Sequence, residues 1–281
     1  MSLGIAFKGA EGIVLAADSR VTLMGQIVLP NSPPTLLPST FDNATKLLQV
    51  PCQPHIGAVT YGAGAIGQQQ PRTAASFLPE FDASIATKGR LSVEDFAQEL
   101  SNFFAQQWHS NNMPTDAPPN NDMVFLVGGY DEGATYGRIF QLSIPHSPKP
   151  SEWHSGALFG AVWGGQSEFI DRMVHGFDLR VPGLVHEVLT GDNKDKDKLF
   201  GPEFRAKLQT PIPWQFLPLQ DCVDLSVFFI RTTIQLQQWI VGVRGVGGAI
   251  DVATITRTDG FKAIQLKQIT GDKTHVLTAH R

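Results

Sequence analysis

The sequence predicts an α+β protein in which two antiparallel sheets pack face to face and helices cover them on the outside. Strand patterns separated by turn residues open the chain, return between residues 122 and 163, and close it between residues 251 and 266. Two helical patterns separate the first group of strands from the second, and two more separate the second from the third. This order of elements suits a layered sandwich. We therefore interpret residues 1–281 as a single domain with two insertions.

The stretch SLGIAFKGAEGIVLAADSRVT, residues 2–22, predicts a β-hairpin. Residues 3–7 are rich in strand formers, the apolar run 13–17 follows, and glycines mark the turn between them. Such a hairpin brings residue 2 back beside Asp18. Once Met1 is removed, Ser2 would carry a hydroxyl nucleophile and a free α-amine base on one residue.

The segment after this hairpin combines short strands with the first insertion. Residues 26–29 and 45–50 have strand character, whereas residues 30–44 contain four prolines, which disfavour regular structure. We interpret 30–44 as an irregular loop with two alternative roles. It is either a surface elaboration or subunit contact, or a lid that filters substrates. A further strand is predicted over residues 55–62.

Two helical patterns precede the middle strands. Pro71 and Pro79 predict a broken helix, because a proline in a helix interior costs about 3 kcal/mol. The segment 92–108 predicts an amphipathic helix with Ser92 as its N-cap.

Two more helical patterns follow those strands, with the second insertion between them. One helix is predicted to begin at Ser167 with this residue as its cap, and a long buried helix is predicted over residues 221–241. Residues 179–218 carry alternating charges and several prolines. A charge run of this kind is typical of a solvated loop.

The composition excludes several classes of function. A formal net charge of −4 and the absence of a lysine-arginine cluster give no support for a nucleic-acid partner or a membrane surface. Cys52 and Cys222 lack a metal-binding motif, which indicates ordinary thiols in a reducing compartment. No apolar run approaches the roughly 20 residues of a membrane span. We expect a soluble, cytoplasmic protein without a cofactor, because phosphate-loop, dinucleotide and metal-spaced histidine motifs are missing.

Two motifs resemble those of the proteasome β-subunit family. Gly4-Ile5 together with GIVLAADSRVT, residues 12–22, is similar to the hairpin that opens those subunits after an N-terminal threonine. GGAIDVATITRTDG, residues 247–260, is similar to their last long strand and the turn after it. The resemblance implies the four-layer αββα sandwich of N-terminal nucleophile hydrolases. It also implies a bacterial-type, homo-oligomeric peptidase.

The resemblance further implies an active site. Ser2 takes the place of the threonine nucleophile, while Asp18 and Lys46 match the catalytic carboxylate and lysine. Arg20 matches the arginine that steadies the carboxylate, and Gly62 the glycine whose backbone N–H forms the oxyanion hole. Thr22 would pair with an extended peptide through its backbone, and the remaining members of the expected substrate site would form a mostly apolar pocket. These pocket residues are Val21, Leu48, Thr60 and Ala63.

The chain departs from the family pattern at supporting positions. Serine lacks the β-methyl group that restricts the threonine rotamer. Gly165, Val243 and Val246 stand where the family has a serine, an aspartate and a second serine. Gly4 also follows Ser2 two residues sooner than the family's glycine follows its threonine. Ser2 therefore either faces the site or, after a one-residue slip, points away from it.

Three hypotheses of function follow. The first is a peptidase that cleaves peptide or unfolded-protein substrates inside a ring or stacked rings, with a second subunit or an unfoldase as possible partner. Ser2 is its nucleophile and the α-amine of Ser2 its base, so Met1 has to be removed. The second is a non-catalytic scaffold subunit that kept the sandwich and its assembly surfaces. The third is a small-molecule amidohydrolase that uses the same nucleophile.

Overall fold

Two five-stranded antiparallel sheets form the centre of the protein. The computed structural model describes residues 2–27, 35–67, 70–116, 121–188 and 201–269. The first sheet, in the order β10-β1-β2-β11-β12, contains β1 (Leu3–Lys8), β2 (Ile13–Asp18), β10 (Gly160–Gly165), β11 (Ile250–Thr256) and β12 (Gly260–Gln265). The second, in chain order, contains β5 (Leu47–Gln49), β6 (Ile56–Gly62), β7 (Met123–Gly129), β8 (Arg138–Ile144) and β9 (Ser147–Trp153). The predicted α+β class with antiparallel sheets is confirmed.

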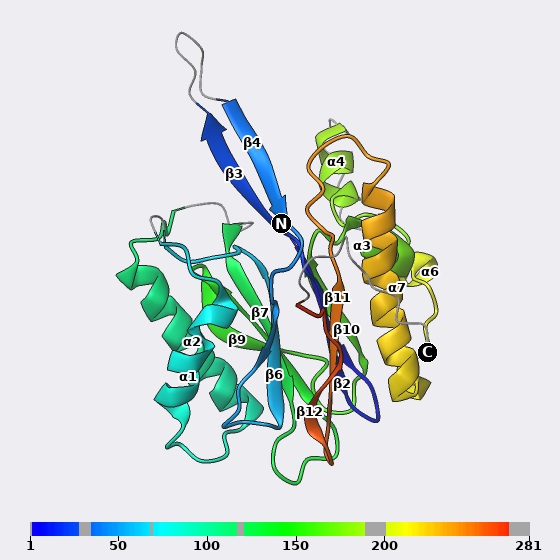
Figure 1. Cartoon of the computed structure of the whole chain (residues 1–281). Coiled ribbons are helices and arrows are strands. Elements are labelled where there is room, and N and C mark those ends of the chain that lie inside the picture. Colours follow the sequence, from blue (N-terminus) through cyan, green and yellow to red (C-terminus); the bar gives the residue numbers. More distant parts are fainter. Residues whose placement is uncertain (1, 28–34, 68–69, 117–120, 189–200, 270–281) are drawn as a thin grey trace, which may run out of the picture.

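Helices cover the outer face of each sheet (Figure 1). α1 (Leu78–Ile85) and α2 (Val93–Ser110) lie on the side of the second sheet, while α3 (Glu168–His175) and α7 (Leu219–Gln237) lie on the side of the first. Three buried apolar clusters fill the spaces between these layers. Representative members are Phe81, Phe96 and Phe104 under α1 and α2, Leu15, Val59 and Leu126 between the sheets, and Phe7, Phe229 and Ile230 under α7.

The predicted first hairpin lies inside its sheet. β1 and β2 pair with Gly4 opposite Ala17 and Lys8 opposite Ile13, and both strands are buried along their whole length. β2 is flanked by β1 and β11, so its side chains face either the helical layer or the second sheet. A continuous apolar run is what a strand covered on both faces requires.

A two-stranded hairpin projects from the sandwich (Figure 1). β3 (Val21–Ile27) pairs with β4 (Thr35–Phe41). The prediction of an irregular loop over residues 30–44 is therefore wrong across β4, while residues 28–34 lie outside the described part of the chain. The prolines suggested a loop, but a strand that pairs on one side only tolerates proline, and β4 pairs with a single strand among the described residues. Pro38 can occupy such an edge position, where its missing N–H breaks no second ladder.

Other sequence-based boundaries also needed correction. β9 was not predicted, because it contains Pro148 and Pro150. These prolines are tolerated because β9 is an edge strand of its sheet. The second insertion contains α4 (Val181–Val188), α6 (Pro202–Leu208) and a 3₁₀ turn at Trp214–Phe216, and its charge run falls outside the described residues. α7 ends at Gln237 instead of Val241. It lies outside its sheet with Phe228 52 % exposed, so it is not buried between layers.

The remaining helix predictions have mixed outcomes. The broken helix is confirmed as a 3₁₀ turn at Ala74–Phe77 followed by α1, which holds Pro79 in its first turn. Ser92 caps α2, with its Oγ accepting the Asp95 N–H at 3.0 Å. Ser167 precedes α3 without a capping bond. Of the helices that the structure describes, none combines the length and apolar character needed to cross a membrane.

Candidate active site

Ser2 lies at the start of β1 with its side chain directed toward the second sheet. Leu3 packs under α7, whereas Ala6 packs between the sheets. Alternation along a strand puts Ser2 on the same face as Ala6. A Cβ on Gly4, which also belongs to this face, would come within 2.8 Å of the Tyr61 ring on β6. Of the two orientations that the sequence left open, Ser2 therefore has the one that faces the expected site.

The backbone of Ser2 is held by the segment that follows β10. The N–H of Gln166 donates to the Ser2 carbonyl oxygen at 2.8 Å. Gly165 precedes it with φ at +101°, and a Cβ there would lie 1.9 Å from the same oxygen. A side chain at this position is excluded by the close approach of the two backbones. The glycine that departs from the family pattern is thus required by the path of the chain at Ser2.

Asp18 is fully buried at the end of β2 and accepts four hydrogen bonds. Its Oδ1 accepts from the Leu3 N–H at 2.9 Å and from Lys46 Nζ at 2.6 Å. Its Oδ2 accepts from the N–H groups of Arg20 at 3.0 Å and Gly247 at 2.9 Å. A carboxylate has about four acceptor sites, so these four hydrogen bonds occupy all of them. Asp18 therefore ties the start of β1 to the segments that follow β2 and precede β11.

Lys46 is the cation of this site. Its side chain is 5 % exposed, and Nζ donates to the Arg20 carbonyl oxygen at 2.6 Å as well as to Asp18. Burial lowers the pKa of Lys46 below its ordinary value, and the attraction of Asp18 opposes that shift in part. Lys46 and Ser2 line the same cavity. The structure thus brings together Ser2, Asp18 and Lys46 as the resemblance implied.

Arg20 binds Asp18 through its backbone N–H, while its guanidinium binds a different carboxylate. Its Nε and Nη2 bind the two carboxylate oxygens of Asp42 at 2.6 and 2.8 Å, and only its backbone N–H reaches Asp18. This bidentate pair raises the pKa of Arg20 and lowers that of Asp42. Arg20 therefore fastens the residue after β4 to the segment after β2. Its hydrogen bond to Asp18 comes from the main chain, while the guanidinium also interacts electrostatically with that carboxylate.

A cavity of about 20 Å³ opens beside Ser2. Val21, Thr60 and Ala63 line it as expected. Leu48 does not, because it is buried under α1 and α2. The walls that were not expected are Ala44, Thr45, Tyr61, Gly64, Thr73 and Ala74. A space of this size holds about one water molecule, so a substrate side chain would have to displace part of the wall.

Thr22 and Gly62 border the site through their backbones. Thr22 follows Val21 in β3, and alternation turns its side chain to the other face. Its Oγ1 is buried and has no hydrogen-bond partner among the described residues. Gly62 ends β6 between two cavity-lining residues, Tyr61 and Ala63. Its φ is +87°, and a Cβ there would lie 2.0 Å from the Asp122 carbonyl oxygen.

Replacement of Gly62 by alanine is expected to lower the free energy of unfolding by about 3 kcal/mol or more, because backbone strain and steric overlap add. Gly89→Ala is the matched control. Its φ is also positive, at +68°, but a Cβ there meets no atom within 4 Å, so a loss of about 1 kcal/mol is expected. Urea unfolding of both variants measures the difference, and equal losses would contradict the steric argument.

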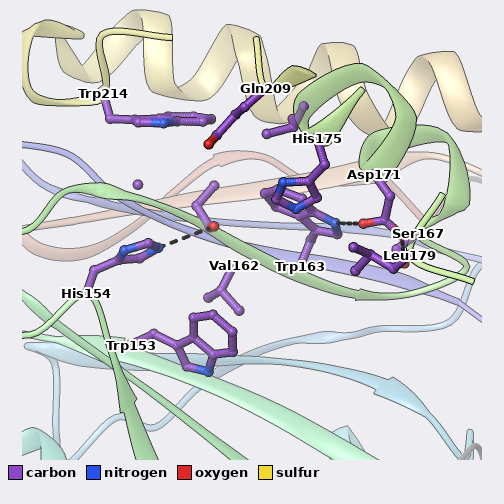
Figure 2. A pocket seen from close by; sticks show the side chains of 13 residues that line it. Trp153, His154, Val162, Trp163, Ser167, Asp171, His175, Leu179, Gln209 and Trp214 are labelled. Atoms are coloured by element: carbon purple, nitrogen blue, oxygen red, sulfur yellow. Dashed lines mark hydrogen bonds between the residues drawn. The ribbon is translucent and has the colours of Figure 1, made fainter. Parts of the chain in front are cut away.

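A larger cavity of about 240 Å³ lies between the edge of the first sheet and α3 (Figure 2). The indoles of Trp153, Trp163 and Trp214 contribute to its walls. The imidazoles of His154 and His175 also line it, and burial lowers the pKa of both, so each is neutral near pH 7. Ser2 and Lys46 do not belong to this cavity.

One row of side chains in the larger cavity has the composition of a nucleophilic triad: Ser167, Asp171 and His175. The Ser167 hydroxyl donates to Asp171 Oδ2 at 2.9 Å, and Trp163 Nε1 donates to Asp171 Oδ1 at 2.9 Å (Figure 2). Within the residues that the structure describes, no hydrogen bond joins His175 to Ser167 or Asp171. A serine without a base in reach is not activated. In this structure the Ser167 hydroxyl is therefore bonded to the Asp171 carboxylate and not to an imidazole.

Sequence reasoning missed the groups that hold Ser2 and Asp18 through the main chain. The N–H donors of Gln166 and Gly247 have no sequence signature, because any residue supplies the same group. Asp42 was missed because it fell in a segment read as irregular. Tyr61 could have been found, since it precedes the expected oxyanion glycine on a predicted strand.

No protein-family model and no curated protein matches this chain.

Proposed function

We propose that this protein is an N-terminal nucleophile hydrolase of the proteasome β-subunit class that cleaves peptide bonds. The observation that carries the proposal is the position of Ser2, which borders a cavity together with Lys46, whose ammonium is bound to the buried Asp18. Two facing antiparallel sheets with helices outside them support the same class, since they are the layers of an αββα sandwich. The fold family and the activity are inferred together from these features.

The proposed reaction uses Ser2 twice. Its hydroxyl attacks the scissile carbonyl carbon while its free α-amine accepts the hydroxyl proton. The tetrahedral intermediate collapses to an ester on Ser2, and the amine passes the proton to the departing peptide nitrogen. Water then attacks the ester with the same amine as base, which releases the acid and regenerates the hydroxyl. Met1 has to be removed for this chemistry, because the amine must belong to Ser2.

Lys46 and Asp18 set the charge around that amine. An α-amine has a reference pKa of roughly 7.7–8.0, and a neighbouring ammonium lowers it by like-charge repulsion. Asp18 keeps the ammonium in place at 2.6 Å. The backbone N–H of Gly62 is the proposed donor to the oxyanion, because Gly62 lies between Tyr61 and Ala63, which both line the cavity.

An extended peptide is the proposed substrate. β3 pairs with β4 alone among the described strands, so its second edge can accept a further strand. Val21, Thr60 and Ala63 favour a small apolar side chain next to the scissile bond. Closed rings of identical subunits are the proposed assembly, with unfolded protein as the substrate and a second subunit or unfoldase as a further partner.

A non-catalytic scaffold is the second candidate, and two observations favour it. The cavity of about 20 Å³ is too small for a substrate side chain as it stands. Val246 and Gly165 also lack the hydroxyl groups that the resemblance led us to expect. Such a subunit would keep the sandwich for assembly alone.

The test is hydrolysis of fluorogenic peptides by protein purified with its natural N-terminus, with the size of the active species measured by light scattering. Turnover by a ring-sized particle is expected. A ring without turnover on any peptide would identify the scaffold. A monomer or dimer that cleaves small amides and leaves peptides intact would identify the amidohydrolase.

The pH dependence of the reaction distinguishes the proposed base from a reactive thiol. Because the amine must be neutral, the rate is expected to rise between about pH 6 and pH 8 and then level off. Burial raises the pKa of the Cys52 thiol to about 11, so a reaction at Cys52 would keep accelerating above pH 9. Stopped-time assays from pH 5.5 to 10 measure the profile, and an unbroken rise to pH 10 would contradict the proposed base.

A further inference from the structure

A buried amide, Gln237, stands between the two backbone segments that hold Ser2 and Asp18. It is the last residue of α7 and is 1 % exposed. Its Nε2 donates to Gln166 Oε1 at 2.7 Å, and its Oε1 accepts the Val246 N–H at 3.0 Å. The orientation of the amide is fixed, because the Val246 N–H can only donate and therefore requires the oxygen.

Each partner of Gln237 adjoins a contact to the candidate catalytic groups. The Gln166 N–H binds the Ser2 carbonyl oxygen at 2.8 Å. Gly247, which follows Val246, binds Asp18 Oδ2 through its N–H at 2.9 Å. Asp18 in turn accepts the Leu3 N–H at 2.9 Å. The hydrogen bonds form a closed circuit that starts and ends at the N-terminal end of β1.

We propose that Gln237 is a positioning residue. By linking the segments 165–167 and 246–247, it holds the nucleophile Ser2 and the carboxylate of Asp18 in fixed relative positions. This inference rests on the proposed hydrolase function. The circuit runs through the side chains of Gln237 and Gln166 and through backbone N–H groups, at a place where Gly165 and Val246 offer no hydroxyl. A buried amide is costly unless its polar atoms are paired, so the side chain specifies one arrangement of both segments.

The first test compares Gln237→Met with Gln235→Met. The two residues lie on the same helix and receive the same substitution, but Gln235 is exposed. The probe is a peptide epoxyketone, and the readout is its saturation kinetics at Ser2. Gln237→Met is expected to lower the maximal rate constant about tenfold without changing the half-saturating concentration, because misplacement of a reacting group slows the chemical step. Gln235→Met is expected to react at the wild-type rate.

A second variant changes the other end of the circuit, at a residue that is less buried than Gln237, so its substitution disturbs the fold less. Gln166 is partly exposed, and Gln166→Met keeps the backbone N–H that binds Ser2. It is expected to show a similar loss, and the double variant is expected to lose no more than either single variant, because both remove one link. Gln237→Glu keeps an acceptor for the Val246 N–H and is expected to recover part of the rate.

Hydrogen exchange supplies a readout that does not depend on reactivity. In Gln237→Met, faster exchange is expected both in the peptide that covers residues 163–168 and in the one that covers residues 244–249. Additive losses in the double variant, or wild-type reactivity of folded Gln237→Met, would overturn this inference and leave the hydrolase proposal standing. A wild-type protein that takes no adduct at Ser2 would overturn the hydrolase proposal and this inference with it.

Discussion

Replacement of Lys46 by methionine is expected to abolish hydrolysis and to lower the free energy of unfolding by about 3–5 kcal/mol. The methionine fills a similar volume but leaves the carboxylate of Asp18, which is fully buried, without its cation. Removal of one partner of a buried ion pair costs far more than the net value of the pair. In the proposed mechanism the α-amine of Ser2 also loses the neighbouring charge that favours its neutral form. Urea unfolding and peptide hydrolysis measure the two effects separately.

The double variant Asp18→Asn/Lys46→Met separates stability from chemistry. With both charges gone, part of the unfolding free energy is expected to return, because no uncompensated charge stays buried. The recovery is incomplete, because the asparagine NH₂ faces at least one of the backbone N–H groups that Asp18 accepts. Hydrolysis is expected to stay absent. Recovery of activity together with stability would contradict a chemical role for the pair, and equal instability of the single and double variants would contradict the electrostatic explanation.

Replacement of Ser2 by alanine is expected to reduce peptide hydrolysis by more than about a thousandfold. The unfolding free energy is expected to change by less than about 1 kcal/mol, because the hydrogen bonds that anchor this end of the chain run through its main chain: Gln166 to Ser2, and Leu3 to Asp18. Ser155→Ala is the matched control, since Ser155 is exposed on the turn between β9 and β10. Ser2→Ala with undiminished turnover would assign the activity to another group.

Much of the fold could be predicted because a strand that is buried on both faces has a nearly continuous apolar sequence. The run 13–17 is continuously apolar, and the strand 56–62 is apolar apart from Thr60. Ser92 with Asp95 marks the start of α2. β4 and β9 escaped detection for the opposite reason. They are edge strands, and prolines that would break an inner strand are tolerated there.

The candidate site was predictable only in part. The pairing of Asp18 with Lys46 was expected only from the resemblance to the proteasome β-subunit family, and the structure shows the bond at 2.6 Å. The contacts through Gln166, Gly247 and Gln237 depend on which backbone segments meet. Tertiary packing decides which segments come into contact, and the partners are far apart in the chain. Asp18 and Gly247, for example, are separated by 229 residues. Leu48 was misassigned because a shift of one position along a short strand moves a side chain to the opposite face.

Peptide mapping after treatment with a peptide epoxyketone tests directly whether Ser2 is an N-terminal nucleophile. The probe forms two bonds to one residue: the hydroxyl adds to the ketone carbon and the α-amine opens the epoxide, with no leaving group. We expect a first peptide that begins at Ser2 and gains the full mass of the probe. A first peptide that begins at Met1 and carries no stable adduct would contradict this expectation.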